Sequence, residues 1–85
     1  RAFLGSCGVD MTDLAVTTSG VEDGLTKKAA VQSSRHKYVV MEREKFYFNE
    51  SYKYTHFDDI SGIITDEFPD DTIVNILRNA GVKLL

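Results

Sequence analysis

The chain has 85 residues, enough for one domain with a modest hydrophobic core. Apolar residues make up 42% and charged residues 27% of the sequence, a balance typical of globular proteins and not of disordered segments or membrane spans. The net charge of −3 argues against the basic surface by which proteins bind nucleic acid. The single cysteine, Cys7, has no partner for an internal disulfide, so we expect a cytoplasmic protein.

The first residues, Ala2–Leu4, are apolar and lead into the glycine-rich turn Gly5–Asp10. This pattern predicts a strand that ends in a loop of close backbone approach. Because the chain begins directly in a strand and without an initiator methionine, we expect it to be part of a longer protein. The residues from Met11 to Gly20 are mostly polar and predict a connection.

A helix is predicted from Val21 to Arg35. Its apolar positions recur four residues apart: Val21, Leu25 and Ala29. Ser19 and Glu22 have the spacing of a capping box, with Thr18 as a competing N-cap. Residues 27–45 hold six Lys and Arg against two acids, which could be a local anion site or only a solvated helix face. Charge alone favours the solvated face.

The segment Tyr38–Met41 is a short apolar run, typical of a strand covered on both faces. Glu42–Lys45 follow at its carboxyl end, where open α/β sheets place their ligand sites. Lys45 is therefore the first candidate for a ligand-binding cation, the alternative being a solvated surface lysine. Six of the nine aromatic residues lie in Phe46–Phe57, which could be a hairpin arm, a lid over a ligand or a packing surface for another subunit. We favour packing.

Two further strands and a helix are predicted in the remaining residues. Phe57–Ile60 is typical of a single helical turn, and Gly62–Thr65 of a short buried strand. A helix should begin at Asp70 or Asp71, with one apolar face: Ile73, Ile76, Leu77 and Ala80. Gly81 would end this helix as its C′ residue.

With a last strand at Val82–Leu85, strands and helices alternate along the chain. Alternation of this kind predicts an α/β fold, a Rossmann-like parallel sheet of about four strands with two crossover helices. We expect residues 1–85 to form a single domain that is the second half of a larger effector domain.

Several motifs follow one another in a recognisable order: Phe3–Asp10, Thr17–Thr18, Lys27–Lys28, Glu44–Phe46, Ile60–Asp66 and Ala80–Val82. Together they resemble the effector domain of DeoR-family transcription regulators over nearly the whole chain. That family usually has Phe-Ile-Gly-Ala-x-Gly-Val, Thr-Thr-Pro, Asp-x-Ser-Lys-Phe and Asp-x-Ile-Thr-Asp in these places. Here Ser19 replaces the proline, and Glu44 replaces the serine before the lysine, which puts a negative charge beside the expected anion site.

The DeoR effector domain is similar to ribose-5-phosphate isomerase and the CoA transferases, so the resemblance implies loops that bind a phosphorylated sugar. The residues that it implies in ligand binding are Gly5, Ser6, Cys7, Gly8, Asp10 and Lys45. In this assignment the loop approaches the ligand, Asp10 accepts a hydroxyl group and Lys45 supplies positive charge. A DNA-binding winged helix would lie upstream of Arg1, outside this chain, and operator DNA would be bound only there.

The alternative function is a sugar-phosphate isomerase. The isomerase loop has the form Asp-Gly-Ala-Asp-Glu, and Leu4–Gly8 lacks each of its three acids, which favours a non-catalytic sensor. A Cys7 nucleophile is a third possibility, but His36 and His56 lie on distant segments and an inert thiol is the better interpretation. The histidines have no metal-ligand spacing, and we expect no metal or cofactor.

Self-association follows from the strand pattern. The predicted strands are apolar throughout, so both faces of the sheet need cover, whereas the two helices should lie on one face. We therefore expect a homo-oligomer that covers the bare face. The alternative is a monomer in which the aromatic segment Phe46–Phe57 folds back over that face.

Overall fold

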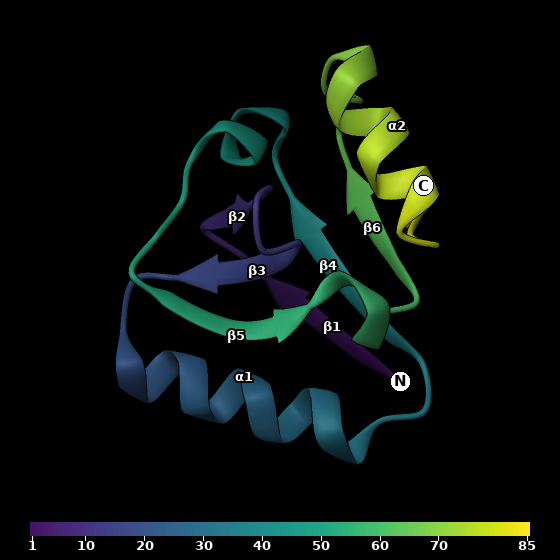
Figure 1. The fold of residues 1–85 in the computed structure, drawn as a ribbon. Helices are drawn as coiled ribbons and strands as arrows, with labels where there is room; N and C mark the ends of the chain where they lie inside the picture. The colour runs from purple at the N-terminus through teal and green to yellow at the C-terminus, as the bar shows by residue number, and fades with distance from the viewer.

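The computed structural model describes residues 1–85 and contains two sheets and two α-helices (Figure 1). The first sheet is parallel, with the strand order β1 (Ala2–Gly5), β4 (Lys37–Met41), β6 (Gly62–Thr65) and β7 (Lys83–Leu84). These are the four strands predicted from apolar runs, and the prediction of a parallel α/β sheet is confirmed. In register, Leu4, Val39, Ile63 and Leu84 lie side by side on the face toward the core.

The second sheet is antiparallel, and the sequence did not predict it. It has the strand order β2 (Gly8–Asp10), β3 (Ala15–Thr18) and β5 (Tyr52–His56). The prediction of a loop and a polar connection for these first two segments was therefore wrong. They are too short and too rich in Thr and Gly to stand out, and they become strands because they pair with each other and with β5.

The helix α1 (Val21–Ser33) was predicted at the right place but with the wrong buried face. Gly24 and Val31 are its buried residues, whereas Val21 and Leu25 are 59% and 55% exposed. The capping box is also absent, because Gly20 is the N-cap and no side chain caps the helix. α1 packs against the antiparallel sheet, mainly β5, and only lightly against β1.

The helix α2 (Asp71–Asn79) agrees with its prediction at both ends. The Asp70 side chain caps it by accepting a hydrogen bond of 3.1 Å from the Ile73 N–H. Gly81 follows with φ = +81°, a left-handed conformation that glycine adopts without strain. Ile73 and Leu77 are buried, as the apolar spacing indicated, whereas Ile76 and Ala80 of the predicted face are half-buried and Val74, outside it, is buried.

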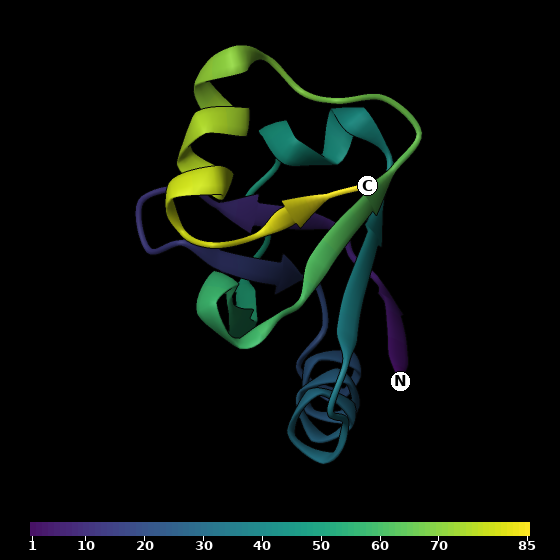
Figure 2. The ribbon, with the colours of Figure 1, turned by 90° about the vertical axis from the view of Figure 1, so that its right-hand side faces the viewer.

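The core lies between the two sheets. Two short 3-10 helices, η1 (Arg43–Tyr47) and η2 (Phe57–Asp59), contribute Phe46 and Phe57 to it. Three aromatic residues of the segment Phe46–Phe57 are buried in the core, Phe46, Tyr54 and Phe57, whereas Tyr47 and Phe48 are each 49% exposed. The segment does not fold over the uncovered side of the parallel sheet. Figure 2 shows that α2, β2 and β3 lie on one side of β4 and β6, while no helix or strand covers the other side.

The uncovered side of the parallel sheet carries large apolar side chains: Phe3, Tyr38, Val40, Ile64 and Leu85. Phe3 is 58% exposed and stacks on Tyr38, with ring centroids 5.5 Å apart. We call this set the open face. No helix of the structure is both long and apolar enough to cross a membrane.

Candidate functional site

The glycine-rich loop leaves the carboxyl end of β1 and turns directly into β2. Ser6 donates its N–H to the Val40 carbonyl oxygen at 3.3 Å, and its hydroxyl lies 2.9 Å from the Thr17 carbonyl oxygen. Gly8 packs against the Phe48 carbonyl group so closely that a Cβ atom at this position would clash with it. The loop is thus held from both sides, and glycine at position 8 is a steric requirement.

Next to this loop, Thr18, Asp23 and Lys27 form a chain of polar contacts between β3 and α1. The Thr18 hydroxyl donates to Asp23 Oδ2 at 2.8 Å, and Lys27 Nζ lies 2.9 Å from the same oxygen. These two neighbours, Lys27 first, lower the pKa of the Asp23 carboxyl group. The same Thr18 hydroxyl lies 3.8 Å from the Cys7 sulfur, which connects the chain of contacts to the glycine-rich loop.

The ring of Tyr54 lies beside Lys27. The pairing of β3 with β5 shifts register between Val16 and Thr17, which leaves Tyr54 as the extra residue of β5. Its side chain is 2% exposed, and its hydroxyl has no hydrogen-bond partner. Burial raises the pKa of this hydroxyl to about 12, and the nearby Ser6 side chain opposes the rise.

Lys45 lies in η1, directly after β4, where the sequence placed it. Its ammonium lies 5.2 Å from the centre of the Phe48 ring, and its side chain is half-buried. η1 packs against β2, and Phe48 accepts a hydrogen bond of 2.7 Å from the Val9 N–H. Glu44 is exposed and forms no ion pair with Lys45.

Asp10 lies at the far end of β2, away from the glycine-rich loop. It accepts hydrogen bonds of 3.0 Å from the N–H groups of Thr12 and Asp13, and it lies 3.3 Å from Lys53 Nζ. These contacts, the Asp13 N–H first, lower the pKa of its carboxyl group. Lys53 also pairs with Asp13. Asp10 therefore already has hydrogen-bond and ion-pair partners, and these contacts stabilise the turn between β2 and β3.

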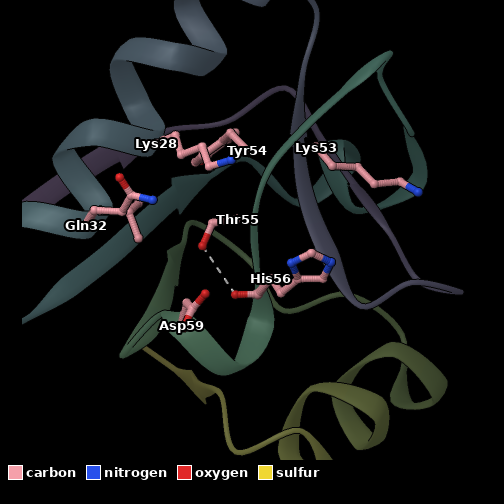
Figure 3. A pocket seen from close by; sticks show the side chains of 8 residues that line it. Lys28, Gln32, Lys53, Tyr54, Thr55, His56 and Asp59 are labelled. Carbon is pink, nitrogen blue, oxygen red and sulfur yellow. Dashed lines mark hydrogen bonds between the residues drawn. The ribbon is translucent and has the colours of Figure 1, made fainter.

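The concave surfaces of the domain lie elsewhere. A hollow of about 120 Å³ opens between α1 and β5, with Lys28, Gln32, Tyr54, Thr55 and Asp59 around it (Figure 3). In Figure 3 the Lys53 side chain extends away from these residues. None of the three hollows in the structure is lined by the glycine-rich loop or by Lys45.

Sequence reasoning gave no role to Asp23 and Tyr54. It used Thr18 as a possible N-cap and Lys27 as part of the basic stretch of residues 27–45, and both as parts of a resemblance. Their signal was weak, because Asp23 looks like any acid in a first helical turn and Tyr54 like any strand aromatic. The Cys7 sulfur has Thr18 beside it and no histidine, which gives it no general base. No group of three His, Cys, Asp or Glu side chains could hold a metal ion.

A parallel α/β sheet with a glycine-rich loop at the carboxyl end of its first strand is typical of domains that bind small ligands. Residues 1–67 match the family of DeoR C-terminal sensor domains, and the chain belongs to this family. The resemblance found in the sequence motifs is thereby confirmed.

The chain is also similar to the HTH-type transcriptional repressor GlcR of Bacillus subtilis (strain 168), with 26% identity over 85 residues. The alignment covers 100% of this chain and 32% of the relative. The chain therefore spans about a third of the length of the curated relative that it matches.

Proposed function

We propose that this domain senses a phosphorylated sugar for a DeoR-family transcription regulator. The family supports an effector-binding role, and the relative GlcR is named as a transcriptional repressor. In this proposal a separate winged-helix domain binds the operator DNA, and the sensor shifts its affinity when the ligand binds. The regulator acts in the cytoplasm, where Cys7 stays reduced.

The observation that supports the proposal is that the glycine-rich loop and Lys45 follow the paired parallel strands β1 and β4, at the same edge of the sheet. Ser6 and Cys7 follow β1, Lys45 follows β4, and Lys27 reaches the same region from α1 through Asp23 and Thr18. Backbone N–H groups of such a loop and lysine ammonium groups are what a phosphate group requires. Gly5, Gly8 and Asp10 complete the proposed ligand-binding set, with Asp10 engaged in its turn until the ligand binds.

The domain works without catalysis in this proposal. Isomerisation of a sugar phosphate needs carboxylates that move protons, and Leu4–Gly8 contains none. Asp10 is the nearest acid in the sequence, and its contacts with backbone N–H groups keep it ionised at the turn.

The test is a titration of pentose and hexose phosphates into the protein expressed from its complete gene. We expect Lys45→Ala to weaken binding by about tenfold or more, because a hydrogen bond to a charged group is lost. Lys83→Ala, which removes an exposed lysine of β7, is the matched control and should bind like the wild type.

Equal affinity of Lys45→Ala and the wild type would remove Lys45 from the site. If no sugar phosphate binds to the wild type, the proposed function itself is wrong. Turnover of a sugar phosphate that disappears in Asp10→Asn would favour the isomerase alternative.

A further inference from the structure

The hydroxyl group of Tyr54 is buried without a hydrogen-bond partner. Phenylalanine would fill the same space without the cost of removing a polar group from water, so burial alone gives no reason for a tyrosine here. Unpaired buried polar groups of this kind are uncommon in folded proteins and often mark a site whose partner is absent.

The surroundings of this hydroxyl are those of the proposed ligand site. Tyr54 lies on β5 between the residues that pair with Val16 and Thr17, and the Thr17 carbonyl oxygen accepts a hydrogen bond from the Ser6 hydroxyl. Lys27 Nζ lies 5.7 Å from the centre of the Tyr54 ring. Tyr54 therefore lies close to the polar contacts that connect α1 and β3 to the glycine-rich loop.

The Lys27 side chain is largely shielded from water, whereas the side chain of its ion-pair partner, Asp23, is exposed. The Lys27 side chain is 17% exposed, whereas the Asp23 side chain is 55% exposed. An ion pair with an exposed carboxylate is weak, because water solvates the carboxylate and dissolved salt screens its attraction to the ammonium group. An anionic group entering beside Lys27 can therefore replace Asp23, and it then also accepts the hydrogen bond that the buried Thr18 hydroxyl gives to Asp23.

We infer that Lys27 and Tyr54 bind the ligand directly, with Lys27 leaving Asp23 to pair with an anionic group and the Tyr54 hydroxyl donating to a ligand oxygen atom. The inference deepens the proposed function and rests on it. Asp23 acts as a stand-in for the ligand anion, and it holds Lys27 in position while the site is empty. The ligand class is a sugar phosphate, which offers both an anionic group and hydroxyl oxygens.

The first test is Tyr54→Phe in the protein expressed from its complete gene, titrated with ribose 5-phosphate and glucose 6-phosphate. This variant should melt at a higher temperature, because an unpaired buried hydroxyl is gone, yet bind the sugar phosphate about tenfold more weakly. Such opposite changes are the mark of a functional group that costs stability. The control Tyr52→Phe, on the same strand, should alter neither property.

The second test compares Lys27→Met with Lys28→Met. The two lysines are neighbours on α1, but Lys28 is exposed and borders the hollow of Figure 3. We expect Lys27→Met to weaken binding of the sugar phosphate by about tenfold or more and to leave binding of the unphosphorylated sugar unchanged. Lys28→Met should retain wild-type affinity.

The outcomes separate the inference from the proposed function. Unchanged affinity in both Tyr54→Phe and Lys27→Met, with a wild type that binds, overturns the inference and leaves the sensor function standing. A stronger effect of Lys28→Met than of Lys27→Met would place the anionic group of the ligand in the hollow between α1 and β5, which Tyr54 also lines, and overturns the inference that Lys27 binds this group. A wild type that binds no sugar phosphate overturns both.

Discussion

Asp10 illustrates how one side chain can satisfy both a structural and a ligand-binding interpretation. The resemblance to DeoR effector domains implied a ligand-binding carboxylate at this position. In the structure it accepts two backbone hydrogen bonds at the turn between β2 and β3 and pairs with Lys53. A carboxylate with these partners stabilises the fold whether or not a ligand binds.

The pH dependence of stability tests that structural role. The pKa of Asp10 is lowered in the folded state relative to about 3.9 in an unfolded chain, so its contribution is present above that pH and is lost as the pH falls through the folded value. Asp10→Asn should therefore be less stable than the wild type at pH 7, with the difference shrinking in acid. Urea unfolding over a pH series, with the exposed Asp58→Asn as control, measures it. A constant difference at all pH values contradicts the role.

At the scale of elements, a glycine of α1 allows the helix to pack closely against the antiparallel sheet. Gly24 faces the ring of Tyr52 on β5, and a Cβ atom there would overlap that ring. Helix propensity favours alanine by about 0.5–1 kcal/mol, but overpacking typically costs about 1–3 kcal/mol. The close contact therefore explains a residue that looks unfavourable in the sequence.

We expect Gly24→Ala to lower the free energy of unfolding by about 1 kcal/mol, because the clash exceeds the gain in propensity. Removal of the ring in Tyr52→Ala should reverse the sign, so that Gly24→Ala becomes neutral or stabilising in that background. Urea unfolding of the four proteins in this cycle provides the measurement. Independent, additive effects of the two substitutions would show that the contact is not limiting.

The elements that could be predicted from the sequence are those with a strong local pattern. Apolar runs marked the parallel strands, and an aspartate cap with apolar spacing marked α2. β2 and β3 have no such pattern, because their strand structure comes from pairing with other segments. β3 pairs with β5, a segment more than thirty residues later in the sequence, where Thr18 lies opposite Tyr52. The buried face of α1 was missed for a related reason, since Gly24 is buried only by the Tyr52 ring.

The same limit applies to the candidate site. Ser6, Cys7 and Lys45 could be proposed because motifs surround them, and their ligand role remains a prediction. Tyr54 could not, because only the register shift opposite Val16 and Thr17 turns it inward. Side chains placed by such an irregularity leave no periodic signal in the sequence.

At the scale of the whole molecule, the open face leaves large apolar side chains exposed to water. Phe3, Val40 and Leu85 are 58%, 43% and 52% exposed, and they lie on one flat side of the parallel sheet. Clustered apolar side chains of this kind favour association, whereas single ones are normal on a surface.

We therefore expect the 85-residue chain to associate with itself through the open face. Light scattering should give an apparent mass that rises with concentration, and Val40→Lys should lower it by placing a charge in the contact. Leu25→Lys, which changes a residue on α1 that is 55% exposed, is the control and should associate like the wild type. A strictly monomeric wild type that binds no hydrophobic dye would rule out the association.

The position of β1 at the edge of the parallel sheet determines when the sheet can form. Ala2 pairs with Lys37 and Gly5 with Val40, and β1 has no other strand beside it. Within residues 1–85, β1 can therefore pair only after the ribosome has delivered β4, whereas the neighbouring strands β2 and β3 can pair as soon as both have emerged. Contacts between distant segments form slowly, so the pairing of β2 with β3 should form before that of β1 with β4.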